Sequence, residues 1–271
     1  MNKLNKNYHT HSIFCDGKGL PEEYVNKAIE LGFTSLGFSS HAPVPFKNDW
    51  SLVEEKVMDY KNEIIRLKNK YKDKIEIKLG LEIDYIPDVT TSFENRRNDL
   101  ELDYVIGSVH LVKSENNGEL WFIDGPEEGY KKGMENLFSS PQKAVEAYFN
   151  QINEMIIKER PNIVGHFDKV RMYNHDSLYF QENSDWYRDL INNTLNVFKQ
   201  HNTIVEINTR GIYRKKLKDF FPQTWIIKEC IKKEINLIVN SDAHSPNELN
   251  GYFDETYNML KEFGIDINYK L

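Results

Sequence analysis

The sequence has few of the features that mark secreted or membrane-spanning proteins. Its 271 residues include only two cysteines, Cys15 and Cys230, which lie far apart and outside any CxxC pattern. This scarcity favours a reducing compartment without structural disulfides. The first residues, MNKLNKNYH, hold no apolar signal segment, and no run approaches the roughly 18 apolar residues of a membrane span. We therefore expect a cytoplasmic protein with no membrane partner.

The chain also lacks an excess of positive charge. Its 35 Lys and Arg residues are outnumbered by 42 Asp and Glu residues, and the formal net charge is −7. A general nucleic-acid surface needs a basic face, so we expect no nucleic-acid partner. This count omits bound metal ions, whose charge can make a local pocket positive.

No linker or low-complexity tract interrupts a repeated pattern of apolar runs and helical stretches. The runs are 7–12, 33–42, 75–85, 103–112, 161–170, 202–211 and 235–244. The helical stretches are 21–32, roughly 51–71, 90–99, 141–159, 184–200, 222–234 and 254–264. Seven such βα units predict an α/β fold in which one domain, residues 1–271, closes into a barrel. An open doubly wound sheet is the alternative, but no GxGxxG follows the first run to support a dinucleotide site.

One connection is longer than the others. The segment at about 113–140 exceeds an ordinary loop. We expect it to form a hairpin and a loop near the functional site.

Polar and ionisable residues gather where the predicted strands end. The side chains concerned are His9, His11, Ser39, His41, Glu82, His110, His166, Glu206, Asn208, Arg210, Asp242 and His244. In a βα barrel, the C-terminal strand ends and the loops after them carry the active site. His175 and His201 lie outside this pattern, and we expect them to be structural or solvated. The placement predicts that the other six histidines converge.

The pair His9 and His11 shows why partners matter. On a strand, residues two apart share a face, so the two rings would project together, and Asp16 follows in the turn CDG. Alone, such a pair is more often an exposed polar terminus. The alternation in LIVNSDAH, which places Asp242 and His244 on one face, favours convergence instead.

Histidine and carboxylate without thiolate are ligands typical of zinc, manganese or iron in hydrolytic sites. The nine candidates are His9, His11, Asp16, His41, Glu82, His110, His166, Asp242 and His244. One ion needs only four to six ligands, so the set predicts two or three divalent ions that share a bridging carboxylate. A general acid–base pair of carboxylates is the competing, weaker interpretation.

The ordered motifs HTHSIFCDG, SSHAP, GLEIDY, GSVHLV, VGHFD, EINTRG and SDAH resemble the PHP (polymerase and histidinol phosphatase) superfamily. Within it, the chain is similar to the bacterial histidinol-phosphate phosphatases. The resemblance implies a distorted (β/α)7 TIM-like barrel with a trinuclear metal centre. It implies a first ion held by His9, His11, Glu82 and Asp242, a second by Glu82, His110 and His166, and a third by Asp16, His41 and His244. Many family members have histidine at the position of Asp16.

The resemblance further implies hydrolysis of L-histidinol phosphate, a step of histidine biosynthesis. Asp242 is then expected to pass a proton to the leaving alkoxide, and Arg171 and Arg210 are expected to bind phosphate. Ser39 is a further candidate to donate a hydrogen bond to the phosphate. Asp124 is either a turn residue or a partner for the substrate's ammonium. The alternatives are another phosphate ester, including a nucleotide or nucleic-acid end, and a non-catalytic metal-stabilised module.

Overall fold

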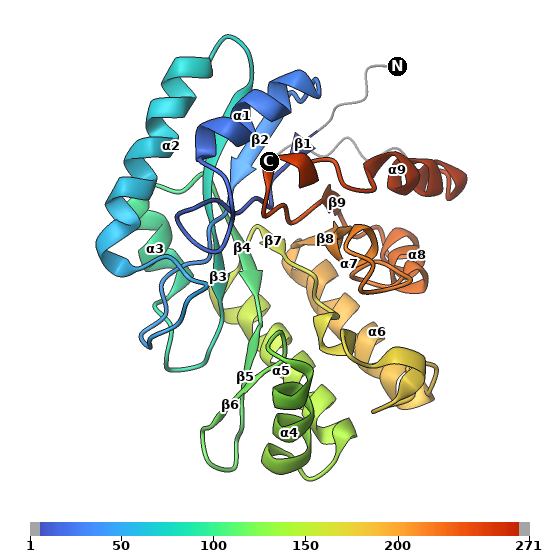
Figure 1. Ribbon diagram of the computed structural model, residues 1–271. Coiled ribbons are helices and arrows are strands. Elements are labelled where there is room, and N and C mark those ends of the chain that lie inside the picture. The colour runs from blue at the N-terminus through green and yellow to red at the C-terminus, as the bar shows by residue number, and fades with distance from the viewer. Residues whose placement is uncertain (1–5, 266–271) are drawn as a thin grey trace.

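Seven short parallel strands form the wall of a barrel (Figure 1). The structure is a computed structural model that describes residues 6–265. The strands lie in the order β1 (Lys6–Asn7), β2 (Ser35–Phe38), β3 (Glu76–Asp84), β4 (Tyr104–Ser108), β7 (Ile163–Val164), β8 (Ile204–Asn208) and β9 (Leu237–Asn240). Their order in the sheet follows their order in the chain, as expected for repeated βα units. The predicted α/β barrel is confirmed.

The barrel closes between the first and last strands, just beyond their regular ends. Thr10 and Ala243 form a parallel bridge. Ala243 N donates to His9 O at 3.1 Å, and His11 N donates to Ala243 O at 2.8 Å. The open doubly wound alternative is therefore wrong. The predicted strand at 7–12 is regular only at its start, and this bridge holds the remainder.

Helices cover the outside of the sheet (Figure 1). They are α1 (Pro21–Glu30), α2 (Val57–Tyr71), α3 (Phe93–Leu100), α5 (Pro141–Glu159), α6 (Asp185–His201), α8 (Thr224–Lys232) and α9 (Phe253–Glu262). Local sequence sets where they begin: Pro21 opens α1, and Ser140 Oγ accepts from Lys143 N at the start of α5. α2 begins later than predicted because Leu52 N donates to His41 O, which ties this segment to the end of β2.

The long insertion forms a hairpin followed by a helix. β5 (Leu111–Lys113) and β6 (Leu120–Phe122) are antiparallel, and α4 (Glu127–Leu137) follows them. The predicted hairpin is present, but helix replaces most of the predicted loop. Other short elements in the loops are η1 (Glu54–Lys56), η2 (Lys169–Arg171), η3 (His175–Ser177), α7 (Arg210–Tyr213) and η4 (Pro246–Glu248).

Two buried apolar clusters hold the layers together. The larger fills the space between strands and helices. The smaller fills the barrel interior and consists of Tyr8, Tyr104, Ile106, Ile163, Ile204 and Ile238. A Cβ at Gly80 would lie 2.5 Å from the Tyr104 ring, so glycine is needed where this ring crosses the barrel.

Both cysteines are free thiols. None of the helices within residues 6–265 combines the length and the apolar character needed to cross a bilayer.

Candidate metal centre

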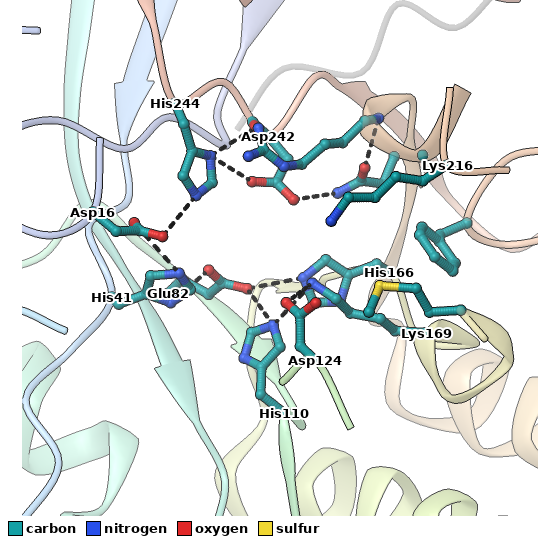
Figure 2. A pocket seen from close by; sticks show the side chains of 15 residues that line it. Asp16, His41, Glu82, His110, Asp124, His166, Lys169, Lys216, Asp242 and His244 are labelled. Carbon is teal, nitrogen blue, oxygen red and sulfur yellow. Dashed lines mark hydrogen bonds and ion pairs between the residues drawn. The ribbon is translucent and has the colours of Figure 1, made fainter. Parts of the chain in front are cut away.

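A cavity of about 220 Å³ opens at the C-terminal ends of the strands (Figure 2). Seven of the nine predicted ligands line it: Asp16, His41, Glu82, His110, His166, Asp242 and His244. The other two, His9 and His11, are fully buried and contact Glu82 and Asp242. The structure thus brings all nine predicted side chains together.

Glu82, on β3, lies at the centre of this group and is only 1% exposed. Five imidazole nitrogens surround its carboxylate. Its Oε2 is 3.2 Å from His9 Nε2, 3.4 Å from His11 Nε2 and 3.0 Å from His41 Nδ1. Its Oε1 is 3.1 Å from His166 Nε2 and 3.8 Å from His110 Nε2. Because the two oxygens face different sets of histidines, this carboxylate is placed to bridge two cations.

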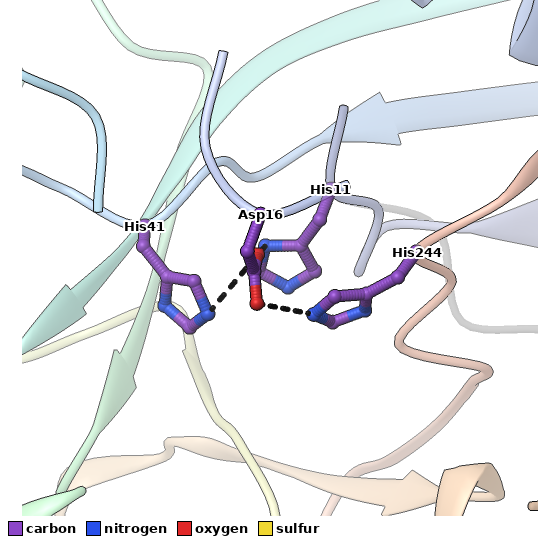
Figure 3. A group of neighbouring side chains, drawn as sticks. All are labelled: His11, Asp16, His41 and His244. Carbon is purple, nitrogen blue, oxygen red and sulfur yellow. Dashed lines mark hydrogen bonds and ion pairs between the residues drawn. The ribbon is translucent and has the colours of Figure 1, made fainter. Parts of the chain in front are cut away.

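A second group lies around Asp16, in the turn that follows His11 (Figure 3). Asp16 Oδ2 is 3.1 Å from His244 Nε2, and its Oδ1 is 3.9 Å from His41 Nε2. The His11 ring lies 4.4 Å from the His41 ring and 4.2 Å from the His244 ring. Gly17 permits this tight turn, since a Cβ there would lie 2.4 Å from His11 O. These side chains form a group that fits one metal ion.

Asp242 follows β9 with a left-handed backbone, at φ +52°. A non-glycine residue held in this region typically costs about 1–3 kcal/mol and is found most often at functional sites. Its Oδ1 is 3.4 Å from both His11 Nε2 and His244 Nδ1, and Asn208 Nδ2 donates to its Oδ2 at 3.2 Å. Burial favours the neutral acid, but His9 and the other nearby imidazoles hold the pKa of Asp242 well below its usual value.

Two buried carboxylates behind the site fix the orientation of two histidine rings. Glu206 Oε1 is 2.6 Å from His9 Nδ1, and Asp84 Oδ1 is 3.0 Å from His110 Nδ1. A carboxylate accepts, so each Nδ1 donates to it and each Nε2 faces the cavity. Burial opposes protonation of the two rings, but Glu206 and Asp84 outweigh it and raise the pKa of His9 and of His110. A cation would bind the form of each ring in which Nε2 has no proton. Both rings are thus set to bind a cation through Nε2.

Several of these atoms are buried without any hydrogen-bond partner in the described part of the chain: His9 Nε2, His11 Nε2, His41 Nδ1 and Glu82 Oε2. Leaving buried polar groups unsatisfied is unfavourable. His9 Nε2, His11 Nε2 and Glu82 Oε2 converge, and a shared cation would satisfy these three atoms together. The donor set therefore fits divalent metal ions.

The pKa shifts of His11 and Glu82 agree with this fit. Burial, with the neighbouring His244 and His41, lowers the pKa of His11 well below its usual value, so the ring is neutral. Burial opposes ionisation of Glu82, but His9 and His41 outweigh it and hold the pKa of that carboxyl well below its usual value. Neutral imidazole and ionised carboxylate are the forms that bind metal.

Lys169, in η2, is a cation of the cavity that the sequence analysis did not identify. It is 7% exposed, and its Nζ lies 2.7 Å from Asp124 Oδ2 and 3.3 Å from His110 Nε2. Burial disfavours the ammonium, but Asp124 and Asp242 outweigh burial and raise the pKa of Lys169. The cavity thus holds a fixed positive charge beside the ligand cluster.

Arg210 and Lys216 also line the cavity and add positive charge to it. Arg210 Nη1 donates to Asp242 O at 2.8 Å and lies 3.3 Å from Tyr213 Oη. Glu248 Oε2 also lies 3.5 Å from this Nη1. All of these contacts fall on Nη1, so we expect Nε and Nη2 of Arg210 to be able to reach an anion. Lys216 lines the cavity with an exposed side chain.

The structure places Arg171 and Ser39 away from this cavity. Arg171 Nε donates to Glu182 Oε2 at 3.3 Å and Nη1 donates to Phe220 O at 3.2 Å, and the residue lines a neighbouring cavity. Ser39 is fully buried, and its Oγ accepts from Thr10 N at 3.0 Å. Neither side chain lines the metal-centre cavity, so the phosphate-binding role expected of Arg171 and Ser39 stays a prediction that this geometry does not support.

The sequence held a signal for one of the supporting residues. Asp84 lies two positions after Glu82 on a predicted strand, so the two side chains share a face. Strand periodicity places Glu206 on the same face as Asn208. It does not reveal that Glu206 contacts His9 and orients its ring. Lys169 follows the strand end by several residues, and strand periodicity carries no information there.

Comparisons with known proteins agree with this geometry. The family model for the PHP domain matches residues 7–210. The histidinol-phosphatase of Bacillus subtilis is 27% identical over 265 residues, which cover 92% of this chain and 96% of the relative.

Two solved structures have a similar fold. The histidinol phosphate phosphatase of Lactococcus lactis, complexed with Zn, L-histidinol and phosphate, has a TM-score of 0.70 at 23% identity and covers 97% of this chain and 95% of that one. A chain from Listeria monocytogenes assigned as a histidinol phosphatase has a TM-score of 0.79 at 21% identity, covering 92% of this chain and 99% of that one.

Proposed function

The chain belongs to the PHP domain family, and from that premise we propose that it is a metal-dependent phosphomonoesterase that hydrolyses L-histidinol phosphate to L-histidinol and phosphate. The similarity to proteins named histidinol-phosphatase and histidinol phosphate phosphatase supports L-histidinol phosphate as the substrate. The observation that carries the chemistry is the cluster of unsatisfied histidine nitrogens around Glu82, with lysine and arginine at its rim.

We propose that two or three zinc, manganese or iron ions bind here. His9, His11, Glu82 and Asp242 would hold the first ion, Glu82, His110 and His166 the second, and Asp16, His41 and His244 the third. The two faces of Glu82 support its bridging position. Bound divalent ions supply Lewis-acid stabilisation of phosphoryl oxygens and lower the pKa of a coordinated water.

The chain's own cations then hold the substrate phosphate. Lys169 binds the phosphate in the way first expected of Arg171. Arg210, which also lines the cavity, offers its remaining N–H groups to the same phosphate. Guanidinium and ammonium groups form charge-assisted hydrogen bonds to phosphate oxygens. Asp242 contacts both the ligand cluster and Arg210. Because its carboxyl is ionised, we assign it to accept the proton released by the attacking water and to pass that proton to the leaving alkoxide.

The test is phosphate release from L-histidinol phosphate and from p-nitrophenyl phosphate by metal-loaded and chelator-treated protein. We expect metal-dependent turnover with a strong preference for L-histidinol phosphate. Lys169→Met and Arg210→Met should each lower kcat/KM about ten- to a hundred-fold on both esters. Lys132→Met, on the exposed face of α4, serves as the matched control.

Equal rates on the two esters would remove the substrate assignment and keep the phosphatase. No phosphate release from either ester by metal-loaded protein would contradict the catalytic proposal altogether.

A further inference from the structure

Asp124 is a carboxylate of the cavity that the proposed metal sites do not use. Its carboxylate lines the cavity, and Oδ2 is 2.7 Å from Lys169 Nζ (Figure 2). An ionised carboxylate this close to the ammonium weakens the attraction of Lys169 for phosphate and repels phosphate itself. Phosphate binding alone therefore does not explain Asp124.

Hydrogen bonds to the residues on both sides of Asp124 fix its position at the end of the insertion hairpin. The preceding residue, Ile123, is fully buried, and its N–H donates to His110 O at 2.9 Å. The following residue, Gly125, accepts from Tyr173 Oη at 2.7 Å. The side chain is 30% exposed, so its contact with Lys169 leaves part of the carboxylate open to the cavity. The hairpin thus presents a carboxylate to a bound ligand.

The ion pair also matches the charges of the proposed substrate. L-histidinol phosphate carries an ammonium separated from its phosphate by two carbon atoms and the ester oxygen. A phosphate near Lys169 therefore brings that ammonium close to the phosphate site, where the neighbouring carboxylate is Asp124. A substrate with both charges can replace one internal ion pair by two intermolecular pairs.

We propose that Asp124 recognises the ammonium of the substrate, and that binding exchanges the Lys169–Asp124 pair for Lys169–phosphate and Asp124–ammonium pairs. The inference rests on the proposed function and deepens it, because it defines the substrate class as phosphomonoesters of amino alcohols. Asp124 is then a specificity-determining residue contributed by the insertion. An ester without the amine leaves Asp124 paired to Lys169 and binds less well.

The experiment compares L-histidinol phosphate with its amine-free analogue, imidazolylpropyl phosphate. In Asp124→Asn we expect kcat/KM for L-histidinol phosphate to fall about ten- to a hundred-fold, mainly through KM. Turnover of the amine-free ester should stay the same or improve, since Lys169 is released. Asp124→Glu should restore part of the amine preference. Glu119→Gln, at an exposed position of the same hairpin, should leave both substrates unaffected.

A binding measurement separates this inference from the proposed function. Calorimetric titration of zinc-loaded protein with L-histidinol should show about tenfold or greater loss of affinity in Asp124→Asn, with unchanged affinity for imidazolylpropanol. Amine-dependent binding without turnover would support the inference and contradict the proposed function. If the parent protein turns over L-histidinol phosphate but Asp124→Asn loses kcat/KM equally on both esters, Asp124 only positions Lys169 and the inference is overturned. Unchanged kinetics in Asp124→Asn would overturn it as well.

Discussion

Along three strands of the barrel, the inward-facing residues change from apolar to polar within a few positions. The alternate residues are Ile106 and Ser108 on β4 with His110 after it, Ile204, Glu206 and Asn208 on β8, and Ile238 and Asn240 on β9 with Asp242 after it. The first of each series belongs to the apolar cluster inside the barrel, and the last lines the cavity or directly contacts the ligand cluster. One backbone pattern therefore supports two environments.

The two ends make opposite contributions to the free energy of folding. Burying an isoleucine side chain stabilises a fold by about 1.5–3 kcal/mol. At the other end, ionised carboxylates and unsatisfied imidazoles are buried, which is unfavourable until a cation binds. The left-handed backbone of Asp242 adds strain at the same end. Substitutions at the two ends should therefore have separable effects, one on stability and the other on metal binding and activity.

The largest effect is expected at Glu82. Glu82→Ala removes the carboxylate that faces five imidazole nitrogens, whereas His41→Ala removes a single ring. Glu82→Ala should lose the larger share of bound metal, and its activity should fall more than about a hundred-fold. Metal analysis of protein prepared without chelator provides the measurement. Equal metal loss in the two variants, or a greater loss in His41→Ala, would rule out the bridging role.

The apolar end should respond in the opposite way. Ile238→Ala leaves a cavity in the barrel interior and should lower the free energy of unfolding by about 2–5 kcal/mol, with unchanged metal content per folded chain. Urea denaturation and metal analysis test the two parts. Ile157→Ala, at a side chain that is 48% exposed, is the control and should change stability by only about 0.5 kcal/mol. Metal loss in folded Ile238→Ala would show that the two ends are coupled.

The same comparison shows what could be predicted from sequence. Strand periodicity sets which way a side chain points, so residues on or next to strand ends, such as Glu82 and Asp242, were placed correctly in the cavity. Periodicity fails in the turn after β7: Lys169 and Arg171 both lie in η2, yet only Lys169 lines the cavity. Ser39 shows another limit of periodicity, because an inward direction does not reveal that its hydroxyl is buried beside Thr10 N.

A smaller effect is expected for the buried support behind the ligands. Glu206 accepts from His9 Nδ1 and from Asn240 and Asn208 side chains. Glu206→Gln keeps the volume but can donate to His9, which permits the wrong tautomer. We expect metal affinity to weaken about ten- to a hundred-fold, as measured by titration against a chelating indicator. Glu94→Gln, at an exposed position of α3, is the control. Unchanged affinity would mean that the orientation of His9 does not depend on Glu206.

The smallest effect on catalysis is expected at Arg171, the residue that first looked like a phosphate ligand. Its guanidinium is held by Glu182 and Phe220 O and lies over the Phe221 ring, with 5.7 Å between the guanidinium carbon and the ring centroid. Arg171→Met should therefore cost about 1–3 kcal/mol of stability, because it leaves the carbonyl of buried Phe220 without this donor and removes the cation beside the Glu182 carboxylate. Its kcat/KM for L-histidinol phosphate should stay within about twofold of the parent, well below the loss expected for Lys169→Met. Thermal unfolding and steady-state kinetics on the same preparations separate the two quantities. A loss of turnover in Arg171→Met as large as in Lys169→Met, at unchanged stability, would return Arg171 to the phosphate site and extend the catalytic end of the barrel into the neighbouring cavity.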